Sequence, residues 1–394
     1  WAACNNNSFA ITHVNLAAGA TFLDAGAGTT NGARTLRGSA FDTTFNNAGT
    51  YERNGLGTTI LDSSVQNTGA ILVNGGTLIL KQPISLYKTG TSTGLIRVAS
   101  GATLQIEGGA FSMDSGTLNN DGSLTISGGA ITTLGPDVAY TGRGTIEVAS
   151  AGVFNSKRTE SLTTDRLVSQ GGTARFSGAV ETRSLEVSGG RGVGSAVSIT
   201  ADSLQWAGGI LGSSDQAGGI TTVNGTTTIS SKSGSKTVGK GHTLNLNGNT
   251  TWAANDDAID FNGYPGDQGR INIKEGATFT DEGTGSRYGN RSIGHTNDDG
   301  IIHNAGTFVR LNQGTTLVGK IENTGTVSVK SGKLALGKGG VNTGTLSTEP
   351  TGTLAFSGGA FVNRGRIQNQ GSISIDKSCV TIKNGNDYSG TGSI

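Results

Sequence analysis

The chain is poor in the residues that mark several common classes of protein. Only 4 of its 394 residues are proline, although 67 are glycine, and this imbalance excludes collagen-like and proline-rich disordered chains. Aromatic residues make up 5% and charged residues 14% of the sequence, whereas disordered segments are usually rich in charge. The composition therefore predicts an ordered, polar and largely uncharged protein.

Long apolar runs and an excess of one charge are also missing. No stretch approaches the roughly 18 consecutive apolar residues that indicate a membrane-spanning helix. The 29 Lys and Arg residues nearly balance the 28 Asp and Glu residues, and the charges are scattered, so no basic patch for nucleic acid or anionic lipid is present. We expect neither membrane insertion of this segment nor nucleic acid binding.

An internal repeat organises the glycine-rich sequence. A phrase of the form Asn-x-Gly recurs, as NAGT, NTGT or NRGR. Within each cluster of phrases, successive glycines are about 20 residues apart, a short period that is typical of solenoids, in which each repeat forms one coil. The glycines are Gly49, Gly69, Gly306, Gly325, Gly344 and Gly365.

A second phrase, in which apolar residues alternate with polar ones on both sides of a turn, fills each period. Such alternation places one face inside and one outside, so each phrase is expected to form two short strands joined by a bend that contains glycine. Helical spacing is absent. The phrases are ILVNGGTLIL (71–80), IRVASGATLQI (96–106), IEVASAGVF (146–154), INIKEGATF (271–279) and VSVKSGKLAL (327–336).

These patterns predict an all-β protein that is a single right-handed parallel β-helix, or β-solenoid, of about 19–21 residues per coil. Handedness follows the general preference of parallel crossover connections. We expect one continuous solenoid over residues 1–394, with irregular loop excursions near 154–166, 252–268 and 280–300, where alternation is lost and charge is concentrated.

Four asparagines recur at the same place in successive periods: Asn304, Asn323, Asn342 and Asn363. Asparagine side chains can stack into a ladder along neighbouring coils. They can equally well satisfy only the backbone of a turn. Both interpretations fit a β-solenoid.

Several phrases of the repeat together resemble those of a known class of protein. They are LQWAGGILGS at 204–213, GGITTVNGTTTIS from Gly218, and the NTGT and SGATL phrases. This style of repeat resembles secreted bacterial β-solenoids, which include filamentous-haemagglutinin-like exoproteins and autotransporter passengers. The resemblance implies a secreted protein, extracellular or at the cell surface. It also implies a role as an adhesin, a biofilm matrix component or a surface fibre subunit.

The leading hypothesis is a fibre subunit whose copies assemble head to tail through exposed coils, without enzymatic activity or a cofactor. Other cells, surfaces or polysaccharide are further candidate partners. Cys4 and Cys379 lie near opposite ends of the sequence, too far apart in a rod for the Cα separation of about 7 Å or less that a disulfide needs. In a head-to-tail fibre they become candidates for an intersubunit disulfide; two free or buried thiols are the alternative.

Two other functions stay open: an adhesin segment of a longer exoprotein, and a polysaccharide-degrading β-helix enzyme. A glycosidase needs two carboxylates about 5 to 9.5 Å apart, yet Asp165, Asp202, Glu181 and Glu186 form no motif of specific spacing. The four histidines are dispersed and lack metal-ligand spacing.

Two Asn-Asp-Asp phrases supply the candidate calcium ligands Asp256, Asp257, Asp298 and Asp299, because Ca²⁺ prefers oxygen ligands. Solvated turn carboxylates are the favoured interpretation, since aspartate is common in turns. Tyr264 and Tyr288 fall in the expected loops and are candidates for surface contact.

Overall fold

The structure is a computed structural model of the chain. It describes residues 8–11, 13–26, 33–38, 43–81, 89–149, 151–212, 218–230, 235–253, 255, 257–261, 268–284, 291–294, 300–383 and 387–394. The chain divides into two units, unit 1 (Trp1–Arg183) and unit 2 (Ser184–Ile394). In these ranges every regular element is a strand, and they contain no helix that could span a membrane.

Unit 1 contains twenty-one described strands, the last of which crosses into unit 2. They are β1 (Ser8–Ile11), β2 (His13–Leu16), β3 (Thr21–Asp24), β4 (Arg34–Gly38), β5 (Thr44–Asn47), β6 (Thr50–Arg53), β7 (Thr58–Asp62), β8 (Ser64–Asn67), β9 (Ala70–Val73), β10 (Thr77–Lys81), β11 (Gly90–Ser92), β12 (Leu95–Val98), β13 (Thr103–Glu107), β14 (Ala110–Asn120), β15 (Ser123–Ser127), β16 (Ile131–Thr141), β17 (Thr145–Ala149), β18 (Val153–Ser156), β19 (Leu162–Gln170), β20 (Thr173–Phe176) and β21 (Val180–Ser188).

Unit 2 continues with the remaining described strands. They are β22 (Gly192–Ser195), β23 (Ser198–Leu211), β24 (Ile220–Val223), β25 (Thr227–Ile229), β26 (Lys236–Val238), β27 (Thr243–Leu246), β28 (Thr250–Trp252), β29 (Ala258–Phe261), β30 (Arg270–Ile273), β31 (Thr278–Asp281), β32 (Arg291–Ile293), β33 (Ile301–Asn304), β34 (Thr307–Arg310), β35 (Thr315–Val318), β36 (Lys320–Asn323), β37 (Thr326–Leu336), β38 (Gly340–Asn342), β39 (Thr345–Phe356), β40 (Ala360–Asn363), β41 (Arg366–Asn369), β42 (Ser372–Ile375), β43 (Cys379–Ile382) and β44 (Tyr388–Ser389).

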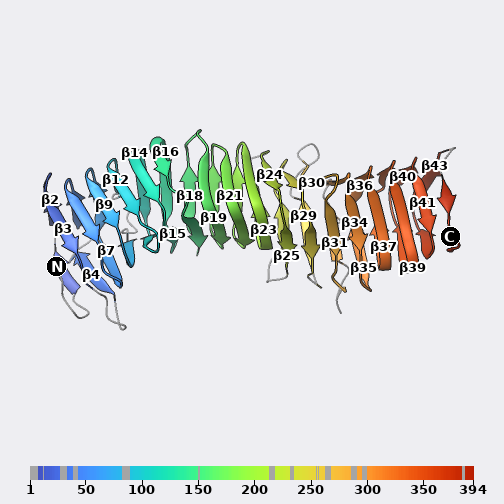
Figure 1. Cartoon of the computed structure of the whole chain (residues 1–394), viewed down its shortest axis with the longest axis horizontal. Helices are drawn as coiled ribbons and strands as arrows, with labels where there is room; N and C mark the ends of the chain where they lie inside the picture. Colours follow the sequence, from blue (N-terminus) through green and yellow to red (C-terminus); the bar gives the residue numbers. More distant parts are fainter. Residues whose placement is uncertain are drawn as a thin grey trace. The chain divides into compact units, whose positions relative to one another are not determined.

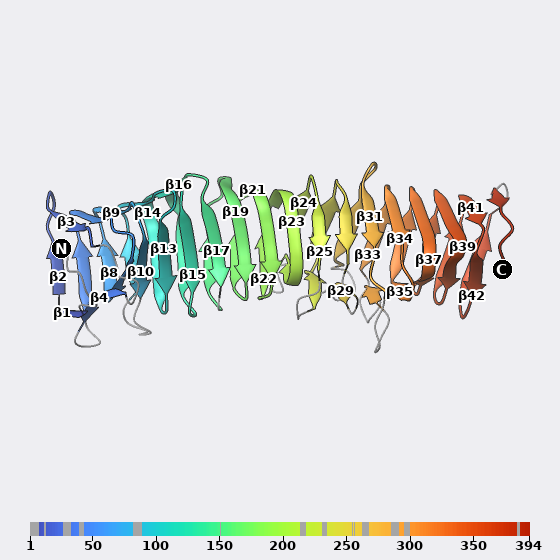
Figure 2. The ribbon, with the colours of Figure 1, turned by 60° about the horizontal axis from the view of Figure 1, so that its bottom comes forward.

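Apart from the outermost described strands, the strands pair in parallel with strands of the preceding and following coils. In unit 1, β7 lies between β4 and β10, and in unit 2, β33 lies between β30 and β36. Within each unit, strands from successive coils lie side by side (Figure 1 and Figure 2). The expected parallel β-solenoid is therefore confirmed.

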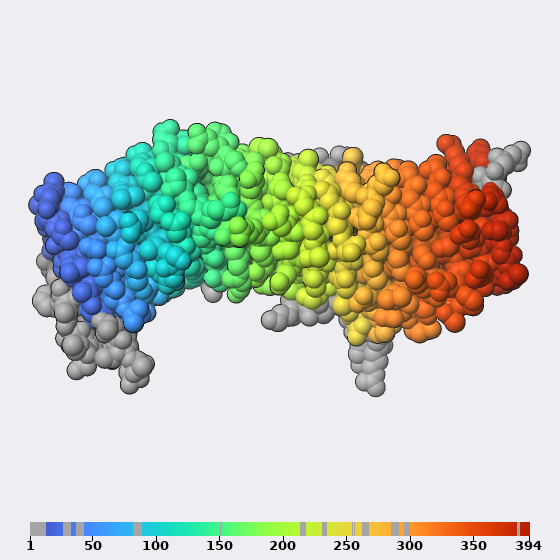
Figure 3. All heavy atoms as spheres, viewed as in Figure 1, coloured from blue at the N-terminus to red at the C-terminus, as the bar shows by residue number. Residues whose placement is uncertain are grey.

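The register gives the length of a coil directly. Thr77 pairs with Thr58, and Ser123 pairs with Thr103. These offsets match the period of about 20 residues expected from the repeat. Longer coils also occur, such as the one of 31 residues from Arg270 to its partner Ile301. In the space-filling view, the coils of each unit follow one another as bands of colour (Figure 3).

The core consists of the inward residues of alternating strands. In β9 and β10 the side chains of Ile71, Val73, Leu78 and Leu80 are fully buried, and the residues between them are partly exposed. Burying one such side chain contributes about 1.5–3 kcal/mol. Each coil thus gains stability mainly through a few apolar positions packed against neighbouring coils.

The alternating phrases form two strands at four of the five places where two were expected. ILVNGGTLIL forms β9 and β10, with Gly76 at φ +61° in the bend. VSVKSGKLAL instead forms one strand, β37. The strand is not interrupted because Ser331 and Gly332, in the bend, still pair with Thr351 and Gly352 of the next coil. The register shifts once, after Val329.

The expected loop excursions are described to different extents. In 154–166, only residues 157–161 lie between β18 and β19, and Arg158 there is buried. Parts of 252–268 and 280–300 lie outside the described residues. The described parts include β29, β32 and the end of β31.

Candidate functional site

The four asparagines predicted as a ladder lie inside unit 2, on β33, β36, β38 and β40. Their side chains are buried and in register along successive coils. The amide nitrogen of Asn304 donates to the amide oxygen of Asn323 at 2.7 Å. Asn323 donates likewise to Asn342, and Asn342 to Asn363, each at 2.6 Å.

Every amide in this ladder points the same way. The second N–H of each side chain donates to a backbone carbonyl, such as that of Thr326 for Asn304 at 2.8 Å and that of Gly365 for Asn363 at 3.0 Å. The amide oxygen of Asn304, at the head of the ladder, is buried without a hydrogen-bond partner in the described structure. The coil before it presents Ile273 at the paired position, which offers no side-chain donor.

A buried charge cluster lies in the same unit. The carboxylate of Asp281 is within 2.8 Å of Arg291 Nη2 and 3.2 Å of Arg310 Nη1, and all three side chains are fully buried. Arg310 also donates to the carbonyls of Gly283 and Gln313, at 2.5 and 2.6 Å. Burial raises the pKa of Asp281, while the two guanidiniums oppose this shift. Two cations thus share one anion in the core.

A matching cluster occurs in unit 1. Asp24 contacts Arg34, and its Oδ2 lies 3.7 Å from Arg53 Nε. Tyr51 donates its hydroxyl to Asp24 at 2.9 Å, and burial raises the pKa of this phenol, so it stays protonated. Arg53 donates to the carbonyls of Gly26 and Gly57.

Neither cluster was predicted, although the sequence carries a signal for both. In each, an Asp is followed by Arg at the tenth and again at the twenty-ninth position after it, in the similar segments ATFLDAG…NAGTYER and ATFTDEG…NAGTFVR. The aspartate and the second arginine also occupy inward positions of their strands. The aromatic residue two positions earlier in each strand points the same way. Charge at inward positions indicates a buried network.

Asp257, one of the four calcium candidates, belongs to a third contact in unit 2. Its Oδ1 accepts a hydrogen bond from Lys236 Nζ at 2.7 Å, and its Oδ2 accepts one from Trp252 Nε1 at 2.8 Å. The side chain of Lys236 is fully buried and that of Asp257 is 5% exposed. The structure therefore places Asp257 in an internal ion pair, which corrects its interpretation as a solvated turn residue.

The other predicted site residues are less fully placed. Cys4, Asp256, Asp298, Asp299, Tyr264 and Tyr288 lie outside the described residues. Calcium binding and surface contact there stay predictions. The described parts of the chain contain no cluster of three or more His, Cys, Asp or Glu side chains that could hold a metal ion. Cys379 is an exposed free thiol on β43.

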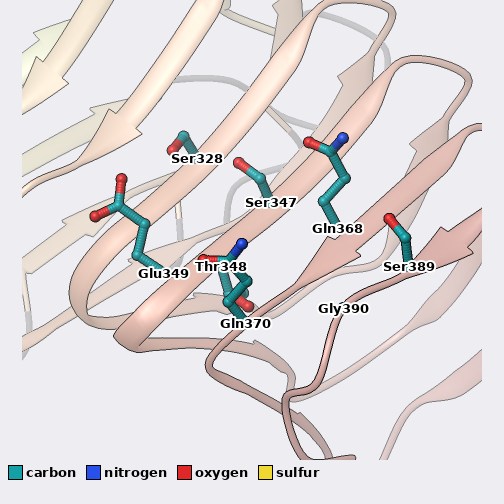
Figure 4. A pocket seen from close by; sticks show the side chains of 8 residues that line it. All are labelled: Ser328, Ser347, Thr348, Glu349, Gln368, Gln370, Ser389 and Gly390. Atoms are coloured by element: carbon teal, nitrogen blue, oxygen red, sulfur yellow. The ribbon is translucent and has the colours of Figure 1, made fainter.

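A polar groove of about 500 Å³ runs over the outer face of unit 2 near its last described coils. Ser328, Ser347, Gln368 and Ser389 form its floor in register from coil to coil. Glu349, Thr348 and Gln370 lie beside this row and also line the groove (Figure 4). The groove thus presents a row of hydroxyl and amide groups at the spacing of neighbouring strands, about 4.8 Å.

No protein-family model, no curated protein and no solved structure matches this chain.

Proposed function

We propose that the chain is a structural subunit of an extracellular bacterial surface fibre or biofilm matrix, assembling end to end through exposed coils. The observation that carries this proposal is the way the coils are held together. Backbone pairing between coils is reinforced inside by the asparagine ladder and by buried ion pairs, which are contacts that stiffen a solenoid. We propose no catalytic role and no cofactor.

The outermost described strands support assembly through coils. β43 and β44 each pair with one described strand, and β2 and β3 do the same in unit 1. Ile375, Ile382 and Tyr388 are 51%, 57% and 45% exposed. Strand edges that carry apolar side chains readily accept another strand, here from a second copy.

Electron microscopy of the purified protein tests this proposal. Long unbranched fibres support it, whereas isolated short particles at high protein concentration contradict it. An Ile382→Lys variant should shorten the fibres, because a charged residue on an edge strand opposes pairing. Thr125→Lys, at a position paired on both sides, is the control and should assemble as the parent does.

The proposed covalent bridge between Cys4 and Cys379 has a separate test. Fibres are denatured without reducing agent and separated by size. A ladder of oligomers that collapses in Cys379→Ser supports the bridge. Monomers alone contradict the bridge but leave non-covalent assembly intact.

The groove favours a second candidate, an adhesin that binds polysaccharide. Hydroxyls, amides and one carboxylate match the hydrogen-bonding groups of a neutral sugar chain. Binding to immobilised neutral polysaccharides should fall at least tenfold in Gln368→Ala but not in Gln105→Ala, a polar residue of unit 1. The lining holds Glu349 as its one carboxylate, whereas glycosidases use two, so release of reducing sugar would favour an enzyme instead.

A further inference from the structure

The contact between Lys236 and Asp257 is unusual for a lysine in this protein. Lys236 is the one lysine with a buried side chain among the described residues. It lies on β26, in register with Gly209 of the preceding coil and Ile259 of the following one. The lysine amine is held in the core beside the carboxylate of Asp257.

Three groups surround that carboxylate. Lys236 Nζ contacts Oδ1 at 2.7 Å, and the indole N–H of Trp252 donates to Oδ2 at 2.8 Å. Arg291 lies with its guanidinium carbon 3.6 Å from the centroid of the Trp252 ring and interacts electrostatically with Asp257. A lysine amine therefore contacts one oxygen, a hydrogen-bond donor contacts the other, and a cation interacts with the carboxylate.

We infer that Lys236 and Asp257 condense into an intramolecular isopeptide bond between neighbouring coils. The carbon Cγ of Asp257 is one bond from the oxygen that Lys236 contacts, so the reactants are held in place by the fold, and such positioning replaces much of the barrier to a bimolecular reaction. The hydrogen bond of 2.7 Å between Lys236 Nζ and Asp257 Oδ1 gives the path along which a proton can pass from the amine to the carboxylate.

The reaction needs no co-reactant. One proton moves from the ammonium to Oδ1 along their hydrogen bond. The lone pair of Nζ then attacks Cγ, and the carbonyl electron pair moves to Oδ2, where the N–H of Trp252 and the field of Arg291 stabilise the negative charge, as donors do in an oxyanion hole. Collapse breaks the Cγ–Oδ1 bond, and Oδ1 leaves as water with one proton from nitrogen. One amide and one water result.

The bond would close a covalent loop from β26 to the residue before β29. This goes beyond the proposed assembly, because it concerns one chain and holds whether or not copies polymerise. It would prevent this coil from separating from its neighbour when the strand pairing is strained.

Intact-mass spectrometry of the purified full chain tests the inference. The expected mass is one water below that calculated from the sequence, and a tryptic digest should contain one branched peptide joining Lys236 to Asp257. Lys236→Arg keeps the cation but removes the amine nucleophile, and Asp257→Ala removes the acid. Both variants should show the full calculated mass.

The exposed pair of Lys81 and Glu107, at 4.0 Å, is an internal control that should yield no branched peptide. A parent protein of full calculated mass overturns the inference and leaves a buried ion pair. So does a loss of water that persists in Lys236→Arg. Trp252→Phe should fold and condense more slowly, because it lacks the donor to Oδ2; an unchanged rate would contradict the assigned role of Trp252.

Discussion

Asp24 and Asp281 are equivalent residues 257 positions apart in the chain. The same interval separates Arg34 from Arg291 and Arg53 from Arg310. It also separates Gly26 from Gly283, whose carbonyl oxygens accept hydrogen bonds from Arg53 and Arg310. The stacked rings also correspond: Phe22 on Tyr51, and Phe279 on Phe308. Two stretches of the chain therefore build the same core around one carboxylate and two guanidiniums.

Replacing Asp281 with Asn should strongly destabilise unit 2. Arg291 and Arg310 would then share the core without a counter-charge, and removing one partner of a buried ion pair costs about 3–5 kcal/mol. Urea unfolding followed by tryptophan fluorescence measures the loss. Asp165→Asn is the control: this exposed carboxylate pairs with Arg143 and Arg183, and such pairs contribute at most about 1 kcal/mol. Equal losses in the two variants would contradict the central role of the cluster.

Replacing Asn342 with Ala should break the asparagine ladder at its middle. Asn323 would lose an acceptor and Asn363 a donor, both in the core, at a cost of about 2–4 kcal/mol in the free energy of unfolding. Hydrogen exchange should rise in β36 to β40 before it rises elsewhere in unit 2. Asn46→Ala removes a solvent-exposed hydrogen bond to Asn15 and should change stability by less than about 0.5 kcal/mol.

Gly76→Ala should destabilise unit 1 far more than Gly101→Ala. Both glycines have positive φ, +61° and +78°, which costs any other residue about 1 kcal/mol. An added Cβ at Gly76 would lie 2.3 Å from the carbonyl oxygen of Gly57, whereas one at Gly101 would meet nothing within 4 Å. The difference between the two melting temperatures isolates the close approach of the coils. Equal losses would mean that φ alone decides.

Acid should weaken the protein through His242. This ring is fully buried, contacts Thr221 Oγ1 at 3.0 Å, and has its pKa lowered by burial from 6.5 to about 4. The unfolded chain therefore binds a proton before the folded chain does. Stability is fully present above about pH 6.5 and falls by about 3 kcal/mol as the pH drops to about 4. His242→Gln should lose this part of the pH dependence; an unchanged profile would contradict the assignment.

The sequence predicted the fold because solenoid coils repeat their chemistry. The short and regular period, the alternating phrases and the positions of Asn304 to Asn363 follow directly from strands stacked in register. Asp281 stands at an inward position of an alternating strand, a signal that could have identified it. Asp257 was beyond that reasoning, since an aspartate in a polar repeat is usually a turn residue. The burial of Asp257 depends on a contact between neighbouring coils, that of Lys236 with Asp257, which no local pattern specifies.

The uniform orientation of the asparagine amides makes the ladder a directional array of dipoles. Its first member, Asn304, offers an acceptor to the preceding coil, so a donor there would extend the array by one step, and Ile273→Asn would supply one. An asparagine with the opposite amide orientation would set two acceptors or two donors against each other. The interior of unit 2 therefore distinguishes one direction along the stack of coils from the other, although its backbone pairing is nearly the same in every coil.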